Sequence, residues 1–111
     1  MSNKSLKYKQ TVGLAAAKTP LDLLDSTLIS GSSILPSVKF FTLQAETQNL
    51  RWRDDGVAPT ATVGNLLAAG KMAQIMRGQF ANFKVIEVAA SATANVTAYD
   101  GEGFLPMQLA G

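Results

Sequence analysis

Apolar side chains recur at every second position in several short stretches of this chain, and glycine, proline and aspartate separate these stretches. The clearest stretch is residues 37–47, SVKFFTLQAET. An extended backbone would place Phe41 and Leu43 on one side and Phe40 and Thr42 on the other, which is typical of a strand covered on both faces. A period of two residues favours a β-strand in such a stretch, because a helix would need apolar positions three or four apart.

A second short strand is expected at residues 50–53, where Leu50 and Trp52 alternate strictly with two arginines. We expect Trp52 to point into the core together with Leu50. The Asp-Asp-Gly sequence at 54–56 then supplies residues that are typical of a turn.

Further strands are expected over residues 10–16, 71–77, 83–90 and 92–99. Residues 66–76 could instead form a helix, since leucine, alanine and methionine are good helix formers. Glycines at 64, 70 and 78 interrupt this segment at strand-like intervals, so we favour a strand. Roughly six to eight short strands at this spacing predict an all-β fold, a single small β-sandwich of jelly-roll type.

A length of 111 residues suits one domain, and the composition divides the chain into three parts. Residues 1–10 are expected to form a basic N-terminal arm, residues 11–100 the β-sandwich domain, and residues 101–111 a C-terminal tail. The tail sequence, GEGFLPMQLAG, contains four large apolar side chains. Burying each of them is worth about 1.5–3 kcal/mol, so we expect the tail to dock on its own domain or on a neighbour.

Cysteine and histidine are both absent. Their absence excludes disulfides, thiolate nucleophiles, Cys/His zinc sites and serine–histidine catalysis. The remaining acidic pair, Asp54 and Asp55, falls short of a calcium site, which usually draws about six to eight oxygen ligands. We therefore expect a protein that is not an enzyme and that uses no cofactor, no metal and no small-molecule substrate.

Only 16% of the residues are charged, against about 25% in ordinary soluble domains. Such a surface usually belongs to a protein that buries part of its exterior against partners. An alanine-rich monomer is the alternative. No apolar run approaches the roughly 18 residues of a membrane span, so we expect a soluble protein, without a membrane and without a cleaved signal.

Arg51 and Arg53 would lie on the same side of their strand, about 7 Å apart. That spacing suits the binding of a carboxylate, a phosphate or an acidic loop of a partner. Alternatively, the two arginines pair with Asp54, Asp55 or Glu46 at the surface, where ion pairs contribute little. Both interpretations stay open at this point.

Tyr8 stands between Lys7 and Lys9, an interleaving of basic and aromatic residues that also occurs in nucleic-acid grooves. The lysines of this short arm would neutralise only about three phosphates, which gives weak attachment. We therefore favour a solvated arm or an arm that lies on another protein, and no nucleic-acid partner.

Four segments in the second half of the chain together resemble a known pattern. They are residues 51–56 (RWRDDG), 59–64 (PTATVG), 67–70 (LAAG) and the strand pair of residues 83–99 that ends in NVTAY. The pattern is similar to that of small virion proteins of tailed bacteriophages, and within these to the capsid decoration, or staple, proteins of epsilon15-like podoviruses.

The resemblance implies a jelly-roll β-sandwich that forms a homodimer on the outer capsid surface and clamps neighbouring subunits of the major capsid protein together. The protein would then be made in the bacterial cytoplasm and reside in the virion. A tail-associated structural protein or a carbohydrate-binding β-sandwich module is the alternative. The residues expected to contact the capsid or the second protomer are Lys4, Lys7, Tyr8, Lys9, Arg51, Arg53, Phe104, Leu105, Pro106 and Met107.

Overall fold

The computed structural model describes residues 4–101, in which strands follow one another with little helix. The strands are β1 (Ser5–Val12), β2 (Ile29–Ser30), β3 (Ser33–Ile34), β4 (Phe40–Ala45), β5 (Leu50–Arg53), β6 (Asn65–Leu67), β7 (Met72–Met76), β8 (Lys84–Glu87) and β9 (Thr93–Tyr99). Single helical turns occur at α1 (Pro20–Leu23), η1 (Ser26–Leu28) and η2 (Arg77–Gln79). The prediction of an all-β fold is confirmed.

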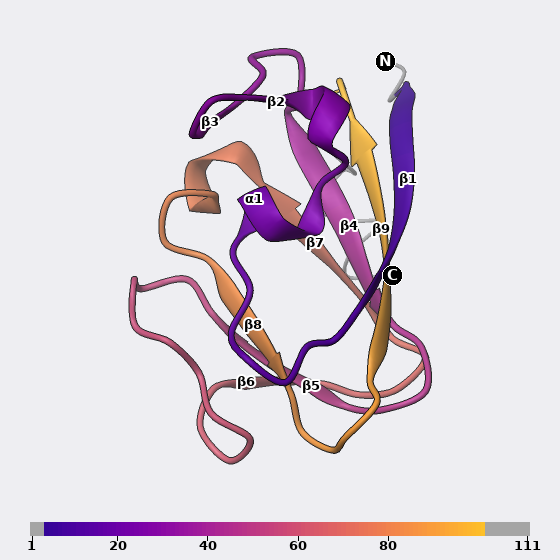
Figure 1. Ribbon diagram of the computed structural model, residues 1–111, viewed down its shortest axis with the longest axis vertical. Coiled ribbons are helices and arrows are strands. Elements are labelled where there is room, and N and C mark those ends of the chain that lie inside the picture. The colour runs from indigo at the N-terminus through magenta and orange to yellow at the C-terminus, as the bar shows by residue number, and fades with distance from the viewer. Residues whose placement is uncertain (1–3, 102–111) are drawn as a thin grey trace, which may run out of the picture.

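The strands form two main antiparallel sheets and a small hairpin (Figure 1). The four-stranded sheet has the order β1-β9-β4-β7, the three-stranded sheet has the order β6-β5-β8, and β2 pairs with β3. Neighbouring strands are mostly distant in sequence, since β1 pairs with β9 and β5 pairs with β8. The sheets therefore tie the beginning of the described chain to its end.

The β4 strand is covered on both faces, as its sequence predicts. Phe41 and Leu43 point into the core, whereas Phe40 and Thr42 are buried on the opposite face. The segment that could have been a helix is the strand β7, which pairs with β4 from Phe40↔Met76 onward. Pairing with a buried central strand outweighs the local helix preference of leucine, alanine and methionine.

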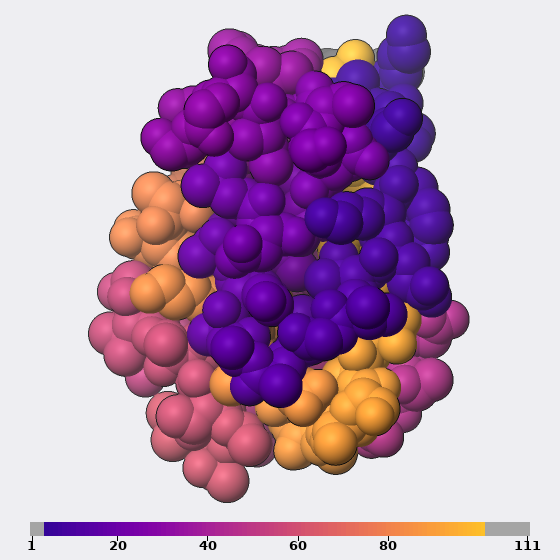
Figure 2. All heavy atoms as spheres, viewed as in Figure 1, coloured from indigo at the N-terminus to yellow at the C-terminus, as the bar shows by residue number. Residues whose placement is uncertain are grey.

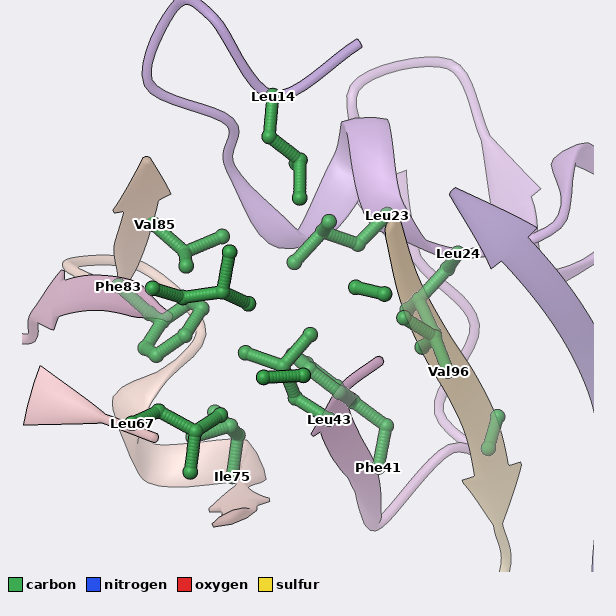
Figure 3. Packing of buried hydrophobic residues seen from close by; sticks show 14 of the residues in the cluster. Leu14, Leu23, Leu24, Phe41, Leu43, Leu67, Ile75, Phe83, Val85 and Val96 are labelled. Atoms are coloured by element: carbon green, nitrogen blue, oxygen red, sulfur yellow. The ribbon is translucent and has the colours of Figure 1, made fainter. Parts of the chain in front are cut away.

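One apolar core joins the two main sheets (Figure 3). Phe41 of the four-stranded sheet meets Phe83 edge to face, with ring centroids 5.9 Å apart. Trp52 of the three-stranded sheet lies 5.7 Å from Phe83 on a tilted plane and packs against the core while partly buried. Such aromatic contacts contribute about 0.5–1.5 kcal/mol each beyond the area they bury.

The segment of residues 13–36 crosses in front of the sheets and closes the core on that side (Figures 1 and 2). Leu14, Leu23 and Leu24 of this segment point inward, toward Val85 and Val96 (Figure 3). The segment thus acts as a third layer and buries leucines that neither sheet could cover alone.

The expected basic arm at residues 1–10 is, from Ser5 onward, an edge strand of the sheet. β1 pairs with β9 as far as Val12↔Thr93, and Thr11 is buried. The sequence was interpreted as an arm because an edge strand needs few apolar side chains and commonly carries lysine. Of the expected tail, residues 102–111 lie outside the described residues.

Candidate partner-binding surface

The expected site residues lie in two different sheets. Arg51 and Arg53 belong to β5 of the three-stranded sheet. Lys7, Tyr8 and Lys9 belong to β1, at the edge of the four-stranded sheet, and Lys4 immediately precedes it. Phe104, Leu105, Pro106 and Met107 lie outside the described residues. The arginines and the lysines therefore form separate surfaces.

Side chains of β1 are largely engaged within the domain. The Lys9 ammonium donates to the carbonyl oxygens of Asp22 and Leu24 at 3.2 and 3.3 Å, where α1 ends. On the other side of the strand, the Tyr8 hydroxyl donates to Oδ1 of Asn95 at 2.6 Å, although the tyrosine is 56% exposed. Lys9 thus holds α1 against the sheet, and Tyr8 keeps an accessible ring.

Lys4 and Lys7 are exposed, but acidic residues lie near both. The backbone N–H of Lys4 donates to the Asp100 carboxylate at 2.9 Å. Asp25 lies near Lys7: hydrogen bonds from the Thr27 hydroxyl and N–H hold the pKa of Asp25 below its ordinary value, and the charge of Lys7 acts in the same direction. This edge therefore has a mixed charge.

The outer side of the three-stranded sheet gathers basic side chains. Leu50 is fully buried and Trp52 packs on the core, so the alternating arginines of β5 point outward. Pairing of β5 with β8 places Lys84 opposite Arg53. The residues opposite Arg51 on this side are Leu66, which is 52% exposed, and Ile86. We call Arg51, Arg53, Leu66, Lys84 and Ile86 the cationic face.

Sequence reasoning anticipated the two arginines but missed Lys84, because residues 84 and 53 are opposite only once β5 and β8 have paired. The alternation within residues 83–90 could have shown that the lysine points away from Phe83 and Val85, which are buried. It could not have shown which strand lies beside it.

Among residues 4–101, Arg53 has one carboxylate partner, Asp55. Its Nε donates to Oδ1 of Asp55 at 3.0 Å and its Nη2 donates to Oδ2, so the pair is bidentate. Asp55 also accepts the N–H of Val57 at 3.2 Å. The Arg53 hydrogen bonds lower the pKa of Asp55, and they raise the pKa of the guanidinium in turn. One arginine therefore follows the surface-pair interpretation.

Arg51 follows neither interpretation completely. Its Nη1 donates to the carbonyl oxygen of Gly64 at 3.1 Å, while its buried Nε has no hydrogen-bond partner among the described residues. Gly64 lies so close that an added Cβ would stand 3.2 Å from the Arg51 Cβ. Arg51 is thus held in place by a backbone carbonyl, and no carboxylate of the described residues pairs with its positive charge.

Acidic side chains beside the cationic face line a shallow hollow of about 270 Å³ together with Arg53, Gly64 and Asn65. They are Asp54 and Asp55, and Asp54 accepts a hydrogen bond from Gln79 at 2.9 Å. Within residues 4–101, no three acidic side chains gather closely enough to hold a metal ion.

A larger hollow of about 450 Å³ lies between α1, β3 and η2. The charged side chain in its wall is Arg77, whose guanidinium donates to the carbonyl oxygens of Ile34, Leu35 and Val38 and lies 5.9 Å above the Phe80 ring centroid. Because these contacts are internal, Arg77 secures the chain at residues 34–38 and presents little charge to a ligand.

Comparison with known proteins yields no match to any family model, to any curated protein or to any solved structure. In the described part of the chain, no helix is long and apolar enough to cross a membrane.

Proposed function

We propose that this chain is a structural protein that binds an acidic surface of another protein through the cationic face. The observation that carries the proposal is the set of Arg51, Arg53 and Lys84 on one side of a rigid sheet, with Asp55 as the carboxylate that pairs with it. The face thus keeps an excess of positive charge, which attracts an acidic partner and sets its orientation.

Apolar neighbours make this face suitable for a protein partner. Leu66 is 52% exposed, and Ile86 lies on the other side of Arg51. Arginine beside exposed apolar groups is typical of protein interfaces, where arginine anchors are enriched and the surrounding contacts exclude water. The backbone contact that positions Arg51 also lowers the entropy lost when a partner binds.

The resemblance to phage staple proteins extends the proposal. The partner would be the major capsid protein of a tailed bacteriophage, and the chain would clamp its subunits on the outer capsid surface as a homodimer. The jelly-roll assignment is part of the same proposal. It is supported by two packed antiparallel sheets in which the first and last described strands are neighbours.

Binding to capsid particles tests the proposal. Particles of an epsilon15-like phage assembled without this chain would be incubated with the purified protein and sedimented, and the bound fraction measured against protein concentration. We expect saturable binding that weakens with salt, and a loss of about tenfold or more in affinity for the double variant Arg53→Ala/Lys84→Ala.

The matched control is the double variant Lys39→Ala/Lys71→Ala, which removes two exposed lysines outside the cationic face. It should bind as the unchanged protein does. The proposal fails if wild type does not bind, or if both double variants lose affinity equally, since the effect would then come from total charge. Steep salt-dependent binding to DNA would point to a phosphate partner instead.

A further inference from the structure

The strands of the four-stranded sheet carry no charged side chain on the outer side from Tyr8 onward. This side consists of alternate residues within 8–12, 40–44, 72–76 and 93–99, and none of them is lysine, arginine, aspartate or glutamate. Asn95 accepts from Tyr8 and donates to Oε1 of Gln44 at 3.2 Å, so one polar row joins β1, β9 and β4. At one border, just beyond the end of β4, the Glu46 carboxylate accepts from Nε2 of Gln10 at 3.0 Å. We call this side the uncharged face.

Burial on the uncharged face is uneven. On the central strand β4, Phe40 is 0% exposed and Thr42 is 3% exposed. At the margins, Tyr8 is 56% exposed, Val12 66% and Met72 56%. The centre of this face is therefore buried, whereas its borders are exposed.

The chain leaves the described region beside this centre. β9 ends at Tyr99, whose ring stacks on Phe40 with centroids 4.8 Å apart and planes 6° from parallel. The ten residues that follow Gly101 contain phenylalanine, two leucines and methionine but one charged side chain, Glu102. A segment with this composition matches an uncharged, partly aromatic surface.

Residues 102–111 are also numerous enough to reach across the whole uncharged face. Ten extended residues span up to about 33 Å. Four strands spaced about 4.8 Å apart are only about 14 Å wide. The segment can thus cross the whole face from the end of β9, and a short connection makes docking on its own sheet more favourable than docking on a second molecule.

We propose that the uncharged face is the docking surface of the chain's own C-terminal segment, residues 102–111. The segment would act as a cover for Phe40 and Thr42, which removes Phe104 to Met107 from the contacts available to a capsid. This inference stands on the face and the adjoining sequence, and it does not depend on the proposed function.

A paramagnetic label tests the proposal in the full-length chain. Because the chain has no cysteine, Gln108→Cys provides a single site for a nitroxide label. We expect amide signals of β4 and β9 to be lost through paramagnetic broadening, and those of β5, β6 and β8 to persist. A label at Asn65→Cys, exposed on β6, is the matched control and should broaden the three-stranded sheet instead.

Two further experiments identify the occupant. In the first, spin-labelled protein without ¹⁵N is mixed with ¹⁵N-enriched protein that carries no spin label. Broadening of the β4 signals in this mixture would show that a second copy supplies the segment, and would overturn the proposal. The variant Thr42→Lys, combined with the label at 108, should restore the β4 and β9 signals. If Thr42→Lys does not fold, Gln44→Lys on the same face serves. Signals of β4 and β9 that never broaden would also overturn the proposal.

Discussion

Arg77 is expected to be a main stabilising contact of the segment that leads into β4. Its guanidinium donates through Nη1 to the carbonyl oxygens of Val38 at 2.7 Å and Leu35 at 2.9 Å, and through Nη2 to that of Ile34 at 3.1 Å. Each such bond is worth about 1 kcal/mol net. Of these three bonds, the one to Val38 is partly shielded from solvent and the other two are exposed. We therefore assign each exposed bond half of that free energy or less.

The variant Arg77→Ala should therefore lose up to about 2 kcal/mol of unfolding free energy, which lowers Tm by roughly 4–8 °C for each kcal/mol lost. Arg77→Lys should lose about half as much, because one ammonium cannot replace a fork that reaches three carbonyls. Urea unfolding followed by the fluorescence of Trp52, the single tryptophan, measures both effects.

Arg53→Ala is the control, since within the described part of the chain its guanidinium forms only the exposed pair with Asp55. The urea midpoint of this variant should not change. The reasoning would be refuted by an Arg77→Ala protein as stable as wild type. If Arg77→Lys is as stable as wild type, the planar guanidinium is not needed, and a positive charge at this position is sufficient.

Two other variants follow from local geometry. Gly64→Ala should lose about 1–3 kcal/mol of unfolding free energy in the same urea assay. The φ angle of Gly64 is 137°, and a Cβ there would stand 3.1 Å from the Pro59 Cβ and 3.2 Å from the Trp52 carbonyl oxygen. The control is Gly78→Ala, which should leave the stability unchanged because nothing lies within 4 Å of the added Cβ. The Thr19 N–H, at 2.9 Å, lowers the pKa of Asp22, so the folded state favours the carboxylate. That stabilisation is complete above the unfolded pKa near pH 4 and is lost as pH falls through the folded pKa. The urea midpoint of Asp22→Asn should therefore depend less on pH below about pH 4 than that of wild type, and an equal pH dependence of the two midpoints would contradict this.

Strand positions could be predicted where burial repeats every second residue. Residues 37–47 and 50–53 predicted β4 and β5 because their apolar and polar positions alternate, and burial on a sheet imposes that alternation directly. β1 escaped because an edge strand needs little apolar surface, so Lys7, Tyr8 and Lys9 looked like a solvated arm.

The candidate site could be predicted only in part. That Arg51 and Arg53 share one side follows from the period of a strand, but the addition of Lys84 follows from strand pairing. Whether each arginine meets a carboxylate also depends on turns: Asp55 reaches back to Arg53, whereas Gly64 offers Arg51 a carbonyl oxygen.

By itself, the sequence determined the all-β class, most strand positions and the lack of thiol and imidazole chemistry, because these depend on local periodicity and on residue types. Only the tertiary structure decided that β1 lies against β9, that the basic side chains of β5 and β8 meet on one face, and that the row of Tyr8, Asn95 and Gln44 joins three strands of the other sheet. These features depend on contacts between residues far apart in sequence, and no short-range pattern encodes which strands pair.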